Sequence, residues 1–328
     1  MNDVESEPSA ASPVATDLLR HRFTRQAAEF VSAASRVRGA EDHDAVHDLR
    51  VSARNLDAML RTWAGWLDSR PRAEALRGLR RLRHRLGSAR ELEAHLALLA
   101  PRVADHGEAL LGFTEKLRRK LLERTTRAAK RLRARRLRPL VERIEALSAS
   151  LGSRPADELR AFDRARAYLL ERRAVARIAV QLALGREDDW LLHEARLAIK
   201  KWRYALESVN GAWADADPDP RPALRQLQQI LGAIQDRTQL IAAIERHRRD
   251  RDRPGFEAVL GQLRAEKQDA FARFRSLAAA RGAPGRTAPR IPRTTRPPEP
   301  EAASAAPGST DERWERMAQW LLGKGHER

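Results

Sequence analysis

Apolar residues recur at spacings of three and four positions through nearly all of the chain between about residue 16 and residue 280. This spacing is typical of amphipathic α-helices, which have about 3.6 residues per turn. Alternating runs rich in Val, Ile and Thr, which would indicate strands, are missing. Proline and glycine fall mostly between the periodic stretches, where helices end. The pattern therefore predicts an all-α fold.

The periodic stretches predict four helices, a boundary and four further helices. The boundary is segment 150–155, which is rich in Ser, Gly and Pro. In the first half, the expected helices cover residues 17–38, 44–67, 71–101 and 108–147, the last of them running on through Pro139. In the second half, they cover residues 156–184, 188–209, 222–249 and 254–279.

The two ends of the chain differ from this helical region. Residues 1–15 are expected to be disordered, and residues 281–310 read as a disordered linker because they are rich in Pro and Arg without apolar periodicity. Residues 311–328 are expected to form a short helix with Trp314 and Trp320 on one face. That helix either docks onto the bundle or binds a partner or a surface.

The charge balance favours an anionic partner. The chain carries 63 Lys and Arg against 45 Asp and Glu, a formal net charge of +18, and clustered positive charge destabilises a folded protein through self-repulsion. Genomic base composition is a sufficient explanation for the excess of Arg over Lys, but not for the net charge.

The absence of cysteine excludes a disulfide framework, a zinc knuckle and a thiol nucleophile. The lack of a long apolar run and the acidic N-terminus favour a cytoplasmic protein.

Two motifs occur twice, in the same order. The sequence His-Asp-Leu-Arg-Val-Ser-Ala-Arg at residues 47–54 matches His-Glu-Ala-Arg-Leu-Ala-Ile-Lys at residues 193–200, and a Leu-Gly-x-x-x-acid element at residues 86–91 matches one at residues 231–236. Both correspondences have nearly the same sequence offset. An internal repeat is therefore predicted, with copies at about 16–150 and 156–280.

In each copy, the spacing places basic residues along one side of a helix. His47, Arg50, Arg54 and Arg61 fall within a stripe of roughly 60°, and His193, Arg196, Lys200 and Arg203 form a similar stripe. Arginine forks match the geometry of phosphate oxygens. A basic helix face is usually only solvated, but the duplication favours a ligand-binding face. The histidines either tune binding with pH or are buried structural residues.

The paired His-acid-x-Arg motifs and the Leu-Gly-x-x-x-acid elements resemble those of the CHAD domain, the conserved histidine α-helical domain, over about residues 16–280. This resemblance implies two four-helix bundles related by a pseudo-twofold axis, with a basic central groove or pore. It also implies binding of inorganic polyphosphate and association with polyphosphate granules. Such domains often accompany a triphosphate-hydrolysing CYTH domain, so a phosphate-metabolising enzyme is a further expected partner.

The resemblance also implies a set of binding residues. With Arg61 added from the stripe, this set is His47, Arg50, Arg54, Arg61, Arg80, Arg83, His84, Arg90, His193, Arg196, Lys200, Lys201, Arg203 and Arg225. Glu91 and Asp236 either orient neighbouring basic side chains or are solvated surface residues. The second copy has Gln228, Gln229 and Gln235 where the first has Arg83, His84 and Arg90, so the binding surface is not expected to be symmetric.

Four candidate functions follow from these features. Non-catalytic polyphosphate binding without a cofactor or metal is the leading hypothesis, because a groove lined by two basic stripes can follow a flexible polyanion. Phosphoanhydride hydrolysis is disfavoured, since metal-binding carboxylates and a glycine-rich phosphate loop are missing. Nonspecific nucleic-acid binding is the main alternative because of the basic run at residues 130–138, and an accessory or regulatory subunit of a phosphate-metabolising enzyme is the other.

Overall fold

The structure, a computed structural model, describes residues 13–37, 43–132, 134–151, 158–209, 219–248 and 255–280. The chain divides into two units, Met1–Pro289 and Arg290–Arg328, and every described residue belongs to the first. The expected linker at 281–310 and the expected helix at 311–328 lie outside the described residues.

The described part of the chain is helical and contains no strand, as the apolar periodicity predicts. Its α-helices are α1 (Pro13–Arg36), α2 (His43–Thr62), α3 (Ser69–Leu99), α4 (Val103–Arg131), α5 (Ala134–Ser150), α6 (Glu158–Gly185), α7 (Asp189–Val209), α8 (Arg221–Arg248) and α9 (Gly255–Ala280). Two short 3₁₀ helices, η1 (Ala64–Trp66) and η2 (Ala100–Arg102), flank α3.

The predicted fourth helix is wrong in one respect, because residues 103–150 form two helices rather than one. Helix α4 buries Leu110 and Phe113 in a cluster with α8 and α9, whereas Leu132 and the buried leucines of α5 join a different cluster with α1 and α2. One straight helix would not direct both sets of side chains into their clusters. The expected continuation of the helix through Pro139 is confirmed.

Helix α1 begins at Pro13 and not at the expected Asp17. Proline is favoured at the first position of a helix, because its missing N–H would have no partner inside the helix there.

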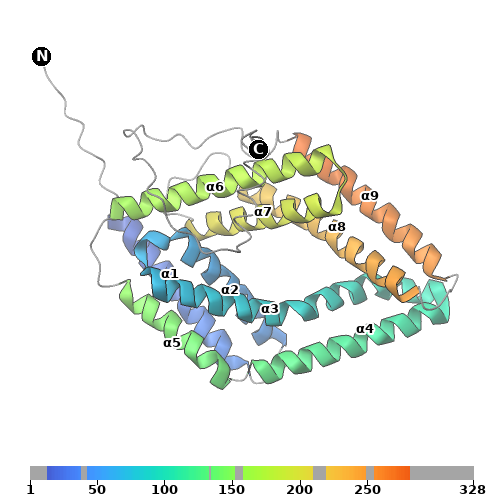
Figure 1. The fold of residues 1–328 in the computed structure, drawn as a ribbon, viewed down its shortest axis with the longest axis horizontal. Helices are drawn as coiled ribbons and strands as arrows, with labels where there is room; N and C mark the ends of the chain where they lie inside the picture. The colour runs from blue at the N-terminus through green and yellow to red at the C-terminus, as the bar shows by residue number, and fades with distance from the viewer. Residues whose placement is uncertain are drawn as a thin grey trace, which may run out of the picture. The chain divides into compact units, whose positions relative to one another are not determined.

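Helices α2, α3 and α4 of the first half contact their counterparts at the predicted offset. Helix α2 packs against α7, α3 against α8 and α4 against α9 (Figure 1). Within the halves, α1–α2–α3–α4 and α6–α7–α8–α9 are chains of consecutive neighbours. A twofold arrangement requires such pairing, although the repeat itself stays a prediction. Helix α5 packs on α1 and α3 and has no counterpart among the described helices.

Helix α3 is long enough to serve two apolar clusters. Ala75, Leu79 and Leu82 are buried in the first cluster with α1, α2 and α5. Leu92 and Leu99, further along the same helix, are buried in the second cluster with α4, α8 and α9. The second cluster thus draws on both halves of the chain.

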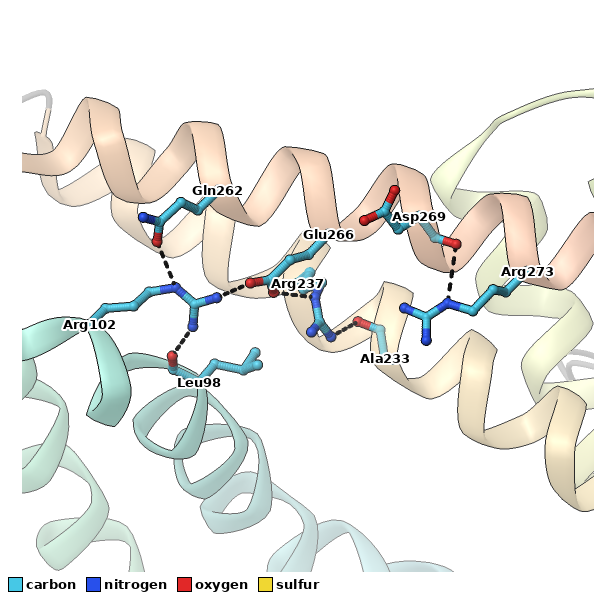
Figure 2. Close-up of polar contacts among 8 residues, drawn as sticks. All are labelled: Leu98, Arg102, Ala233, Arg237, Gln262, Glu266, Asp269 and Arg273. Carbon is cyan, nitrogen blue, oxygen red and sulfur yellow. Dashed lines mark hydrogen bonds and ion pairs between the residues drawn. The ribbon is translucent and has the colours of Figure 1, made fainter.

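A shared carboxylate adds polar contacts between the halves. Glu266 of α9 accepts hydrogen bonds from Arg102 of η2 and from Arg237 of α8, the latter with an Nε–Oε2 distance of 2.9 Å (Figure 2). Arg102 also donates to Gln262 and to the carbonyl oxygen of Leu98. The Arg102 side chain is only 11% exposed, so this carboxylate compensates a charge that has lost much of its hydration.

Close approach between η1 and α6 depends on Gly65. A Cβ atom at this position would lie 2.8 Å from the Cα of Ala161. The approach brings Trp66 and Trp63 edge-on to Phe162, with ring centroids 4.7 and 5.9 Å from that of the phenylalanine. Because the clash would be with backbone, a rotamer change cannot relieve it.

We therefore expect Gly65→Ala to lower the free energy of unfolding by about 1–3 kcal/mol through overpacking. The matched control is Gly261→Ala in α9, where an added Cβ meets nothing within 4 Å. There the lower conformational freedom of alanine should raise stability by about 0.5–1 kcal/mol. Urea unfolding of both variants measures the difference. Equal stability of Gly65→Ala and the parent chain would contradict the close approach.

Candidate functional site

Four mutually packed helices hold all of the predicted site residues. Helices α2 and α7 carry the two basic stripes, and α3 and α8 carry the remaining residues. Helix α2 contacts both α3 and α7, and α8 contacts both α7 and α3. The fold thus brings both motif copies together, whereas the predicted central groove stays a prediction.

On α2 and α3, the carboxylate of Asp57 binds two of the predicted arginines. Arg61 donates from Nε to Oδ2 over 3.0 Å, and Arg83 lies with Nη1 3.3 Å from the same oxygen. The Asp57 side chain is only 12% exposed. Arg61 and Arg83 are therefore held by the protein itself.

The corresponding network on α7 and α8 has the opposite polarity. Arg203 stands where the repeat offset places Asp57, and it is paired with Glu207 at the position of Arg61. Its Nε donates to Oε1 of Gln228 over 2.9 Å. Because the central residue changes from an acceptor to a donor, its partner on the next helix changes from the donor Arg83 to an acceptor. This explains the sequence difference between Arg83 and Gln228.

The aromatic ring of Tyr204 lies between two guanidinium groups, one from each motif helix. The Cζ atom of Arg54 is 4.5 Å from the ring centroid and that of Arg203 is 4.3 Å away. Both distances fall within the range of cation–π attraction. Burial lowers the pKa of Arg54, and the charges of Arg203 and Arg83 lower it further. Tyr204 and Glu207 act in the opposite direction and raise it. Arg54 still remains charged, so its surroundings favour an added anion.

The two motif histidines differ in their surroundings. His47 is exposed on α2. His193 is half-buried, and its Nδ1 lies 2.9 Å from Oε1 of Gln235 on α8. An amide oxygen only accepts, so Nδ1 of His193 carries a proton. Neither ring is fully buried, which disfavours the alternative of a buried structural histidine.

Two buried Nε atoms on the motif helices have no hydrogen-bond partner, those of Arg54 and Arg196. Arg196 lies against Gly232 of the Leu-Gly-x-x-x-acid element, with Nε 3.6 Å from the place where a Cβ would stand. Buried N–H groups without an acceptor are costly. A bound anion would supply the missing acceptors.

The remaining predicted residues lie on the same four helices and differ in exposure. Arg50, Lys200 and Asp236 are half-buried, and the Arg90 side chain is outside the described residues. Those that are exposed are Arg80, His84, Glu91, Lys201 and Arg225. Glu91 and Asp236 both raise the pKa of His95, a residue that the motif comparison does not include.

A cavity of about 300 Å³ opens beside Tyr204, between α1, α2 and α7. Arg22 and Arg25 of α1 line it, together with Asn55 of α2. Burial lowers the pKa of Arg22, and the charges of Arg221 and Arg25 lower it further. The motif comparison missed these arginines because α1 carries no repeated motif.

The comparison of the two sequence motifs also missed Asp57, Tyr204 and Glu207, the partners of the predicted arginines. A signal for two of them was present, because Asp57 precedes Arg61 by four residues and Glu207 follows Arg203 by four. The position of Tyr204 under Arg54 depends on how α2 packs against α7, and no local pattern predicts it.

The described part of the chain contains no group of three or more His, Asp or Glu residues that could hold a metal ion. None of the described helices is long and apolar enough to cross a membrane.

The fold and site define an all-helical protein in which two helices with similar His-acid-x-Arg motifs pack against each other. Comparison with known families agrees, because the CHAD domain model matches residues 21–245. The chain belongs to the CHAD domain family. No curated protein matches it.

Two solved structures share the fold. PptA from Streptomyces chartreusis is 24% identical, with a TM-score of 0.58 over 81% of this chain and 98% of that one. The CHAD domain from the plant Ricinus communis is 19% identical, with a TM-score of 0.54 over 84% of this chain and 92% of that one.

We expect Tyr204→Leu to lower the free energy of unfolding by about 1–2 kcal/mol, because the two guanidinium groups lose the ring face between them. Tyr204→Phe keeps the ring and should cost clearly less. Denaturant unfolding of the two variants distinguishes them. If Tyr204→Phe costs as much as Tyr204→Leu, the hydroxyl group and not the ring stabilises this contact.

Proposed function

We propose that this protein binds inorganic polyphosphate through α2, α7 and the neighbouring faces of α3 and α8, without catalysing a reaction on it. The main support is the pair of buried arginine Nε atoms of Arg54 and Arg196, which have no acceptor within the protein. They lie on two helices that pack against each other. A chain of phosphates offers acceptors and negative charge to both helices at once.

Binding without hydrolysis agrees with the state of the nearby carboxylates. Asp57 and Glu207 lie beside motif-helix arginines, and both are engaged in ion pairs with arginine. Hydrolysis of a phosphoanhydride normally requires carboxylates that bind a metal next to the substrate. The proposed role is attachment of the protein, alone or with a phosphate-metabolising enzyme, to polyphosphate granules in the cytoplasm.

The test reverses three charges of the site, as Arg50→Glu, Lys200→Glu and Lys201→Glu. Arg54 and Arg203 are left intact, because they also pack on Tyr204. The control reverses Arg77, Arg81 and Arg85, three exposed residues of α3 outside the candidate set. Helical circular dichroism confirms that both variants fold.

We expect the site variant to lose retention on immobilised long-chain polyphosphate and the control variant to keep most of it. By analogy with single-stranded nucleic acids, three lost phosphate contacts should reduce the log–log salt slope of binding by about two. Equal losses in the two variants would mean that total charge, and not this site, determines binding.

Competition separates polyphosphate from nucleic acid as the ligand. The parent chain is bound to immobilised polyphosphate at about physiological ionic strength, and free polyphosphate or duplex DNA is added at equal phosphate concentration. Polyphosphate should displace the protein at much lower concentration, because a flexible thread can follow the paired helices and a rigid duplex cannot. Equal displacement by DNA would contradict the proposal and favour nonspecific polyanion binding.

A further inference from the structure

A second cavity, of about 210 Å³, lies between α3, α4 and α8 and is lined by no residue of α2 or α7. Its volume is far above the ~15 Å³ that a single water molecule requires. Its wall contains four cationic side chains, Lys116, Lys120, Arg124 and Arg246, against one carboxylate, Glu91. The three on α4 follow one another at four-residue spacing and so share one face of that helix.

His95 is the buried polar group of this cavity. The residue is 2% exposed, it lines the cavity, and neither ring nitrogen has a hydrogen-bond partner. Packing does not explain a histidine here, because the repeat offset places Leu240 at the corresponding position of α8, also fully buried. An imidazole buried without partners costs free energy that a leucine would not.

The second histidine of the cavity is oriented by its neighbours. The ring of His247 lies 4.9 Å from that of Phe113, and its Nδ1 is 3.2 Å from Nζ of Lys116. An ammonium group only donates, so Nδ1 of His247 accepts, and the proton of the neutral ring lies on Nε2. The wall thus presents N–H donors and positive charge, which is the chemistry that recognises an oxyanion.

We propose that this cavity binds a single tetrahedral phosphate group, either free orthophosphate or the terminal phosphate of a polyphosphate chain. His95 donates a ring N–H to a phosphate oxygen, and Lys116, Lys120, Arg124 and Arg246 balance its charge. This site differs from the one on α2 and α7, which would hold the middle of a thread, because it lies on α3, α4 and α8 and its volume of about 210 Å³ accommodates one compact group.

Protonation of His95 is coupled to such binding. Burial lowers the pKa of His95, and the charge of Arg246 lowers it further. The carboxylates of Glu91 and Asp236 act in the opposite direction and raise it. On α4, Lys116, Lys120 and Arg124 line the same cavity, and His247 lines it from α8. A phosphate dianion reverses this balance, so its binding should raise the pKa of His95.

The experiment follows the histidine ring ¹⁵N signals of the full chain by NMR during titration with inorganic orthophosphate. The His95 signals are assigned by comparison with His95→Leu, which reproduces the residue at the Leu240 position. We expect the His95 signals to shift saturably and its pKa to rise by about one unit or more. If the His95 signals stay unchanged at saturating orthophosphate and also with long-chain polyphosphate whose ends are free, the proposal is overturned.

Affinity measurements on two α4 variants provide the matched comparison. Lys120→Gln should weaken orthophosphate binding about tenfold, the effect of losing one hydrogen bond to a charged group. Arg119→Gln removes one exposed charge from the same helix but does not line the cavity, and it should leave the affinity unchanged. Equal affinity of both variants, or wild-type affinity of His95→Leu, would show that the anion binds elsewhere.

The source of the phosphate is decided by comparing three probes: orthophosphate, long-chain polyphosphate, and polyphosphate whose ends are capped as phosphoramidates. A response to orthophosphate assigns the free anion, and a response only to uncapped chains assigns the chain terminus. A response to capped chains equal to that of uncapped ones would overturn the proposal. The Arg50, Lys200 and Lys201 reversal should leave the His95 response to orthophosphate unchanged, so failure of one site is distinguishable from failure of the other.

Discussion

The packing of α2 against α7 is the contact on which the arrangement of the site depends, and it brings together two helices that each carry a stripe of basic side chains. Repulsion between them is offset by the Tyr204 ring, which Arg54 and Arg203 approach from different helices. Apolar packing adds to this, because Trp63 is buried and donates its indole N–H to the carbonyl oxygen of Ser208 on α7. The basic faces are therefore held close together by contacts that do not require a ligand.

The networks around Asp57 and Arg203 occupy matching positions of the two motif helices and pair their charges in opposite order. An ion pair at four-residue spacing is present in both, but its acid and base have exchanged places. The residue on the adjacent helix differs accordingly, Arg83 next to Asp57 and Gln228 next to Arg203. The second copy thus has fewer cations on its third helix for a reason of local chemistry.

Local patterns predicted much of the fold, because helix formation in this chain follows the apolar period closely. The motif helices and their residues were located in this way. The division between α4 and α5 was not, since it depends on Leu117 and Leu132 entering different apolar clusters. The contact of Arg54 with Tyr204 joins residues 150 positions apart in the chain. His95 was missed because a single histidine in an apolar stretch gives no signal until its surroundings are known.

Buried donors locate a ligand more sharply than net charge does. Many of the arginines in this chain are already paired with a carboxylate one helical turn away, as Arg25 is with Glu29 and Arg138 with Glu142. Such pairs contribute little to recognition of an external anion, because their charge is balanced locally. The Nε atoms of Arg54 and Arg196 and the ring of His95 differ, since each is buried and has no acceptor in the protein. An anion that reaches them restores hydrogen bonds that folding removed, and this gain is available only where the donor is already held in place.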